Sequence, residues 1–187
     1  MHIPVYLEVA QWALLFGLGA LVVVVYRQLG GLLGRGGHPA DLGPVVGSAA
    51  APFRYERVPG GQLSQLRPGG GQPVLLAFVD PTCPACEQLV SNLTTLQADG
   101  ELTGLRILLL ISDPPSYLTI SAAFQATTLE IGRPVSADEV AGYRATGTPL
   151  LVAVDGTGVV RSAGVAREAA EIRSFASTVR ARESEAV

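Results

Sequence analysis

Lysine is absent from this sequence of 187 residues, so all 13 basic residues are arginines. Without lysine the chain has no amine for Schiff-base chemistry and none for a phosphate-binding P-loop. The 16 acidic residues give a net charge of −3, and the arginines form no cluster. A nucleic-acid partner is therefore not expected.

Histidine and cysteine are also scarce. The only histidines are His2 and His38, and the only cysteines are Cys83 and Cys86. A structural zinc ion needs four ligands, and both histidines lie far from the cysteines in the sequence. We therefore expect no metal site, and the two cysteines must be explained in another way.

The cysteines lie where an apolar run meets a helical pattern. Residues 74–79, VLLAFV, are continuously apolar, which is typical of a strand covered on both faces. Asp80 and Pro81 end this run. Beyond the cysteines, leucines recur at helical spacing, at Leu89, Leu93 and Leu96. We expect the pair to occupy the start of a helix.

That position suits thiol chemistry. A helix start has unpaired N–H groups and partial positive charge, which stabilise an anion such as a thiolate. Cys83 is the expected attacking sulfur, and Cys86, one turn later, can meet it in disulfide geometry. Pro84 fits the first helical position, where an N–H would be unpaired anyway. A CxxC beside a βαβ pattern favours redox chemistry over two buried structural cysteines.

The N-terminal part predicts a membrane anchor. Residues 5–26 contain one charge, Glu8, and as a helix of 22 residues they would extend about 33 Å, enough to cross a bilayer. A cleaved signal peptide is the alternative, but a basic n-region and a nearby small-x-small site are missing. We expect residues 1–29 to form a retained single-pass anchor.

The side of the membrane is less clear from the sequence. Arg27 and Arg35 follow the span, and the positive-inside rule would place the C-terminal part in the cytoplasm. Disulfide chemistry instead favours the outside of the cytoplasm. We expect an extracytoplasmic domain at the cell membrane, although the positive-inside rule applied to these two arginines indicates the opposite orientation.

Residues 30–52 are rich in glycine and are predicted to be a flexible linker, followed by a domain over residues 53–187. Within the domain we expect further strands at 53–58, 105–112, 150–154 and 159–163. The helix that begins at the cysteines is expected to end near 99–100, and further helices are expected at 117–129, 139–145 and 167–182. The strand at 53–58 is predicted as an edge strand or a hairpin arm. The last helix is expected to bury Ala170, Ile172, Phe175 and Val179. This order predicts an α/β fold with a mixed sheet sandwiched by helices.

Thr148 and Pro149 open the strand at 150–154. Only about one X-Pro bond in twenty is cis, so the residues alone favour a trans bond.

Three features together resemble the thioredoxin fold: TCPAC after a strand, the Thr148-Pro149 pair opening the next-to-last strand, and the hairpin VDGTGVVRSAG. The resemblance covers about residues 46–182. Val46-Gly47 with Ala51-Pro52-Phe53 resembles the entry motif of membrane-anchored TlpA-like proteins. VDPTCPAC and the N-terminal span are most similar to MauD-type proteins, accessory factors for the maturation of methylamine dehydrogenase.

The resemblance implies that the Thr148–Pro149 bond is cis and lies against the cysteine pair, offering backbone groups to a substrate chain. It makes Pro84 and Ala85 further substrate-binding residues. It also implies attack through Cys83 and release through Cys86, with no cofactor beyond their redox-active disulfide.

Two positions depart from thioredoxins. Ala77 stands where thioredoxins carry a buried aspartate, six residues before the first cysteine, and Thr82 replaces the usual tryptophan. The aspartate acts as a general base for the resolving cysteine. Asp80 or Glu87 could replace it, but both are expected to be solvated charges of the loop and the helix start.

The leading hypothesis is a thiol:disulfide oxidoreductase tethered to the lipid bilayer. It would act on a dedicated client protein with thiols or a disulfide, and exchange electrons with a polytopic membrane partner. The alternative is a non-catalytic interaction subunit of a membrane complex whose disulfide resists mild reductant. A peroxiredoxin is disfavoured because it needs a threonine three residues before its cysteine, where Asp80 stands.

Overall fold

The computed structural model describes residues 43–111 and 122–183, together with Trp12 and Leu14. The chain divides into two compact units, residues 1–38 and 39–187. Apart from Trp12 and Leu14, which are helical and exposed, the predicted span at 5–26 lies outside the described residues. Among the residues described, no helix has both the length and the apolar character needed to cross a membrane.

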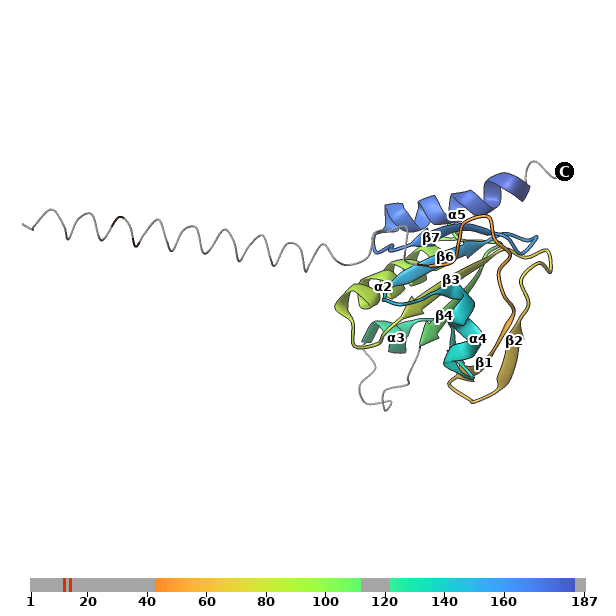
Figure 1. The fold of residues 1–187 in the computed structure, drawn as a ribbon, viewed down its shortest axis with the longest axis horizontal. Coiled ribbons are helices and arrows are strands. Elements are labelled where there is room, and N and C mark those ends of the chain that lie inside the picture. Colours follow the sequence, from red (N-terminus) through yellow and green to blue (C-terminus); the bar gives the residue numbers. More distant parts are fainter. Residues whose placement is uncertain (1–11, 13, 15–42, 112–121, 184–187) are drawn as a thin grey trace, which may run out of the picture. The chain divides into compact units, whose positions relative to one another are not determined.

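The second unit is built on a sheet with the strand order β2-β1-β5-β4-β3-β6-β7 (Figure 1). The strands are β1 (Phe53–Val58), β2 (Leu63–Leu66), β3 (Val74–Val79), β4 (Arg106–Ile111), β5 (Glu130–Pro134), β6 (Leu150–Val154) and β7 (Val160–Gly164). The pairs β3–β4 and β4–β5 are parallel, and the other neighbouring pairs are antiparallel. The predicted mixed sheet is confirmed.

Helices cover both faces of this sheet. They are α2 (Pro84–Ala98), α3 (Ala122–Ala126), α4 (Ala137–Val140), the 3-10 helix η1 (Ala141–Tyr143) and α5 (Ala169–Glu183). One core cluster joins one face of the sheet to buried side chains of α2, α3 and α5. The cluster on the other face contains Tyr143 of η1, with Val140 of α4 packed against it. The predicted sandwich is therefore confirmed.

Strand β3 lies at the centre of both clusters. All six of its residues are buried. Because side chains alternate along a strand, Leu75, Ala77 and Val79 join the cluster with α2 and α5, and Val74, Leu76 and Phe78 join the opposite one. The continuous apolar run is thus explained by burial on two faces, as predicted.

Several predicted elements differ in detail. Strand β1 forms a hairpin arm with β2, as one prediction had it, but it is not an edge strand because it also pairs with the unpredicted β5. In the described part of the predicted helix at 117–129, only α3 is helical, and Leu129 lies between α3 and β5. In α5, Ala170 is exposed and Ala176 is buried, because Ala176 follows Ile172 by one helical turn on the core side.

Part of the predicted linker lies against the sheet. The amide of Gly47 donates to the Val160 carbonyl at 2.8 Å, and the Val160 amide donates to Ser48 at 2.9 Å. Ala50 donates to Gly158 at 2.8 Å, and Ala49 forms a bridge with Val159. Residues 47–50 therefore line the outer edge of β7, where backbone pairing compensates for their lack of large apolar side chains.

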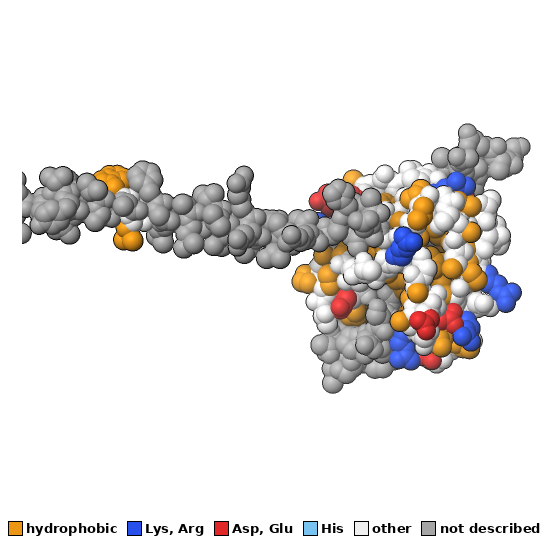
Figure 2. All heavy atoms as spheres, viewed as in Figure 1, with side chains coloured by type: hydrophobic (Ala, Val, Ile, Leu, Met, Phe, Trp, Pro, Cys, Tyr) orange, Lys and Arg blue, Asp and Glu red, His pale blue; other side chains and the backbone are white. Residues whose placement is uncertain are grey.

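The surface carries arginine–carboxylate pairs rather than patches of one charge, and Figure 2 shows blue and red side chains next to each other. Arg54 of β1 pairs with Glu139 of α4 at 2.5 Å, and Arg133 of β5 pairs with Glu56 of β1. Such exposed pairs contribute at most about 1 kcal/mol each.

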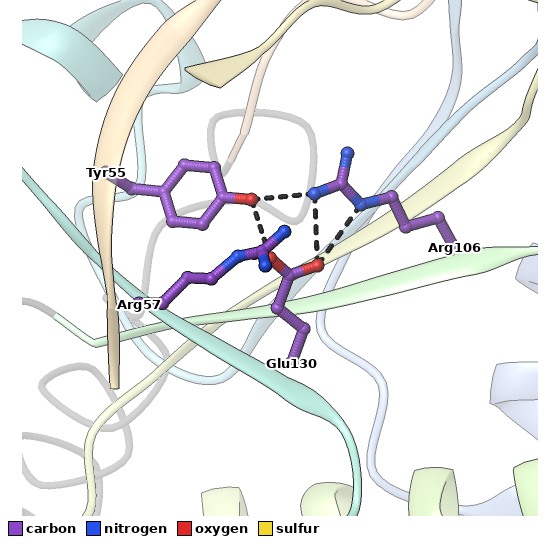
Figure 3. A network of polar contacts seen from close by, with 4 residues as sticks. All are labelled: Tyr55, Arg57, Arg106 and Glu130. Carbon is purple, nitrogen blue, oxygen red and sulfur yellow. Dashed lines mark hydrogen bonds and ion pairs between the residues drawn. The ribbon is translucent and has the colours of Figure 1, made fainter. Parts of the chain in front are cut away.

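A more buried network joins β1, β4 and β5 (Figure 3). The Tyr55 hydroxyl donates to Glu130 Oε1 at 2.7 Å and accepts from Arg106 at 2.6 Å. Glu130 also pairs with Arg106 at 3.0 Å and with Arg57 at 2.8 Å. Burial alone would raise the pKa of Glu130, but Tyr55 and the two arginines lower it below its ordinary value. Burial and the bond to Glu130 raise the pKa of Tyr55.

This network lies away from the cysteines. Arg106 pairs in register with Val74 at the start of β3, whereas Cys83 follows the end of β3. The ring of Tyr55 lies over Gly132, where an added Cβ would be 2.4 Å from Tyr55 Cδ2. The network therefore stabilises the packing of β1 on β5, and only glycine fits beneath the ring.

Candidate active site

A tight turn at the end of β3 positions the first cysteine. Asp80 Oδ1 accepts hydrogen bonds from the Thr82 amide at 2.8 Å and the Thr82 hydroxyl at 2.7 Å. The Cys83 amide donates to the Asp80 carbonyl at 3.0 Å. An aspartate that bonds the backbone two residues on favours such a turn, so the chain leaves the strand and enters α2 at once.

The two cysteines occupy one helical turn. Cys83 is the N-cap residue of α2, and its carbonyl accepts from the amides of Cys86 at 3.0 Å and Glu87 at 3.1 Å. Cys83 is half-buried and Cys86 is fully buried. Their thiols lie within hydrogen-bond reach of each other but are not bonded in this structure. The predicted position at a helix start is confirmed, and the predicted disulfide is not formed here.

The start of α2 is open to an incoming group. Among the residues that the structure describes, no side chain caps the helix, and Pro84 occupies a first-turn position, as predicted. Pro84 is exposed and Ala85 is half-buried beside Cys83. Backbone N–H groups at an uncapped helix start are available to bind an acceptor group.

Cys86 lies in a less polar environment. Burial raises the pKa of its thiol to about 11, and the neighbouring Cys83 adds to the rise. Two donors act in the opposite direction: the Asp80 amide, 3.5 Å from Cys86 Sγ, and the side chain of Thr148. Cys86 is therefore a protected thiol that ionises less readily than a free cysteine, and two neutral hydrogen bonds reduce that penalty.

The Thr148–Pro149 bond is cis, as the family resemblance implies and as base rates did not predict. Thr148 is exposed and reaches Cys86, and Pro149 is buried at the start of β6. The structure thus brings Cys83, Cys86 and Thr148 together, with Pro149 adjacent, from two segments that are more than sixty residues apart in the sequence.

An alanine, Ala77, occupies the position at which thioredoxins have a buried aspartate. Ala77 is buried in the same cluster as Cys86, and among the described residues no carboxylate hydrogen-bonds to Cys86. Asp80 is exposed, and the Thr82 amide and hydroxyl hold its pKa below the ordinary value, so it is a weak base. Glu87 is half-buried in the first turn of α2. Asp80 is therefore a loop charge, as expected, and not a substitute for the missing aspartate.

Comparisons with known proteins agree with this geometry. No family model matches the chain. The methylamine utilization protein MauD of Methylorubrum extorquens is 28% identical over 178 residues, covering 90% of this chain and 82% of that protein. MauD of Methylobacillus flagellatus is 26% identical over 187 residues, covering 92% of this chain and 85% of that protein.

Solved structures match the fold. A putative thiol:disulfide interchange protein DsbE from Chlorobium tepidum has a TM-score of 0.61 at 19% identity, covering 74% of this chain and 97% of that one. A putative protein disulfide isomerase from Bacteroides thetaiotaomicron also has a TM-score of 0.61, at 20% identity, covering 75% of this chain and 92% of that one.

The mixed sheet, the cysteine pair at the start of α2 and the cis proline beside it define a protein of the thioredoxin fold. Within that fold, the similarity to MauD proteins extends over about nine-tenths of the sequence. The chain thus has a thioredoxin fold and is similar in sequence to MauD proteins.

Proposed function

We propose that this protein is a membrane-anchored thiol:disulfide oxidoreductase that acts on a dedicated partner protein. One observation carries the proposal: a half-buried cysteine at an open helix start has a buried cysteine one turn behind it and a cis proline beside the pair. A partly exposed sulfur can attack, and a buried one can resolve the product.

In the reducing direction, the Cys83 thiolate attacks a client disulfide. A Cys83–client disulfide forms and one client thiolate leaves. Cys86 then loses its proton and attacks the Cys83 sulfur, which forms the Cys83–Cys86 disulfide and releases the second client thiolate. The client gains two electrons, and the same steps in reverse form a client disulfide. Thr148, Pro149, Pro84 and Ala85 are the residues against which the client chain docks.

The anchor is part of the proposal. Residues 5–26 are apolar enough to cross a bilayer, and tethering raises the effective concentration of the domain near membrane-bound partners. We place the domain outside the cytoplasm, where disulfides persist. A polytopic membrane protein would supply or remove the electrons.

The client follows from the family resemblance. The relatives are methylamine utilization proteins, and MauD-type proteins serve the maturation of methylamine dehydrogenase. A methylamine dehydrogenase-type protein is therefore the candidate client.

The two cysteines give the test. Cys83→Ser should abolish reduction of a protein disulfide, because no exposed thiolate remains to attack. Cys86→Ser should instead accumulate mixed disulfides, visible as higher-mass bands on non-reducing gels, because nothing resolves them. Equal activity of both variants and of the unchanged protein would contradict the proposal and favour a non-catalytic interaction subunit.

A further inference from the structure

A cavity of about 540 Å³ opens where β3, β4 and β5 end, on the face of the sheet that carries α4. Phe78 and Leu110 line it from the sheet, and Val140 and Ala145 line it from α4 and the loop after η1. Its volume is in the range of sites that bind small molecules or large side chains. Val135, which also lines it, is 44% exposed, so apolar surface continues to its rim.

The charge of this cavity differs from that of the whole chain. Arg133 and Arg144 are among its lining residues, and no aspartate or glutamate is. Two nearby carboxylates are already paired: Glu56 with Arg133, and Glu139 with Arg54. Asp138 of α4 is exposed to solvent and does not line the cavity. Arg144 has no acidic partner among the described residues. A chain of net charge −3 thus has a cavity lined by two arginines and no acidic residue, and one of these arginines, the exposed Arg144, forms no ion pair among the described residues.

Arg144 is held in place by its backbone. Its φ of 47° lies in the left-handed region, and it is the one non-glycine residue of the described chain with a positive φ. Its amide donates to Ala141 at 3.1 Å, and its carbonyl accepts from Thr146 at 2.8 Å. The preceding Tyr143 is buried and donates to the Ala51 carbonyl at 2.7 Å. Such strained backbone persists where the surrounding structure fixes it, and it is frequent in binding sites.

The cavity adjoins the cysteine site. Thr146 lines it and precedes Thr148, which reaches Cys86, by two residues. Phe78 lines it and precedes Asp80, whose amide donates to Cys86, by two residues. The cavity and Cys86 belong to opposite faces of the sheet, and these two stretches of chain connect them at the end of β3. Figure 2 shows hydrophobic side chains exposed among arginines and carboxylates in the region of α4 and β1.

We infer that this cavity binds the client protein: a large apolar side chain of the client fills it, and an adjacent client carboxylate pairs with Arg144. The inference rests on the proposed function and specifies the client segment, an apolar residue next to an acidic one and close to the reacting cysteine. The apolar lining of the cavity fits an apolar side chain, and the guanidinium of Arg144 fits a carboxylate. A segment with only one of these groups would leave either the apolar lining or Arg144 without a partner.

Binding can be measured without redox chemistry. The probes are short fluorescein-labelled peptides in which serine replaces the reacting cysteine and is followed closely by Leu-Asp, Leu-Asn or Ala-Asp. Fluorescence anisotropy with the full chain in mild detergent gives their dissociation constants. We expect Leu-Asp to bind about fivefold more tightly than Leu-Asn, the size of effect expected for one partly exposed ion pair. Ala-Asp should also bind more weakly than Leu-Asp, because its alanine does not fill the cavity.

Two variants test the assignment to Arg144. Arg144→Asn removes the charge with a residue that tolerates the left-handed region, and the preference for Asp over Asn should disappear. Arg67→Gln is the matched control, because Arg67 is exposed near the start of β3, far from the cavity, and the preference should persist.

Other outcomes are distinguishable. Equal affinity of the unchanged protein for all three peptides would overturn the inference. Displacement of Leu-Asp by acetate or phosphate at millimolar concentration, with no dependence on the leucine, would assign the cavity to small anions and also overturn it. Reduction of a disulfide-linked form of the Leu-Asp peptide, with cysteine in place of the serine, is measured separately: a protein that fails it but discriminates the three serine peptides contradicts the proposed function and leaves the peptide site standing.

Discussion

Cys86 determines how the proposed reaction should depend on pH. Burial raises its pKa to about 11, so only a small fraction of the molecules carries the Cys86 thiolate at pH 7. Below that pKa, each pH unit increases the thiolate fraction about tenfold. Release of the client from the mixed disulfide should accelerate accordingly between about pH 6 and pH 9. Rapid-mixing kinetics with a peptide disulfide measure this step, and a plateau below pH 8 would show that Cys86 ionises more readily than its burial implies.

Thr148 is expected to assist that ionisation. Its side chain hydrogen-bonds to Cys86 and lowers the pKa of that thiol relative to burial alone. Thr148→Val removes the donor, so the resolving step should slow by about threefold to tenfold at pH 7 and its pH profile should shift upward. Thr148→Ser keeps the hydroxyl and should restore the rate. If valine and serine behave alike, the hydroxyl has no role in resolution.

Residue by residue, the sequence was most informative where chemistry depends on spacing. The CxxC spacing predicted that Cys83 and Cys86 share one turn, and it also predicted their position at a helix start. The spacing does not show that Thr148 lies near Cys86, because that proximity depends on how β6 pairs with β3, and the expectation came from the family resemblance. The cis bond at Pro149 came from the family resemblance, since an isolated Thr-Pro pair has no local signal for it.

The packing of β1 on β5 depends on a glycine in β5, Gly132, which has no side chain beneath the ring of Tyr55. A Cβ at Gly132 would lie 2.4 Å from Tyr55 Cδ2, and the Tyr55 hydroxyl is held by Glu130 and Arg106. Gly132→Ala should therefore lower the free energy of unfolding by about 1–3 kcal/mol through overpacking. Urea titration followed by circular dichroism measures the change.

Gly142→Ala is the control for this substitution. The nearest atom to its added Cβ is Ala51 Cβ at 3.7 Å, an ordinary contact, so the stability should change by less than about 0.5 kcal/mol. An equal change in the free energy of unfolding in the two variants would mean that the Tyr55 ring moves to make room for a methyl group. The network around Glu130 would then not fix the position of the ring.

Elements with strong local patterns were predicted well. Strands β3 and β6 are apolar throughout and are bounded by turn residues, and α2 has leucines at helical spacing. The short strands β2 and β5 were missed because LSQL and EIGRP have weak patterns and contain polar residues, glycine or proline. Their strand structure comes from pairing with β1 and β4, which a local pattern does not reveal.

For the molecule as a whole, the anchor and its orientation remain predictions. If residues 5–26 span the membrane, the full chain should stay in the pellet after carbonate extraction of membranes, and a chain lacking residues 1–29 should be released. A membrane-impermeant maleimide on intact cells, applied after mild reductant, should then label Cys83 if the domain lies outside the cytoplasm. Labelling that requires permeabilised cells would mean that Arg27 and Arg35 indicate the orientation correctly.

The pairing of residues 47–50 with β7 limits how a client can bind. That edge of the sheet is occupied by the chain itself, through Gly47, Ser48 and Ala50. The opposite edge is β2, a strand of four residues at the far end of the sheet from β7, with β1, β5 and β4 between it and the cysteine-bearing β3. A client that recognised this protein by β-augmentation would therefore dock out of reach of Cys83. If the proposed reaction takes place, the client would therefore be recognised by contacts around Cys83 and Pro149 and not by pairing with an edge of the sheet.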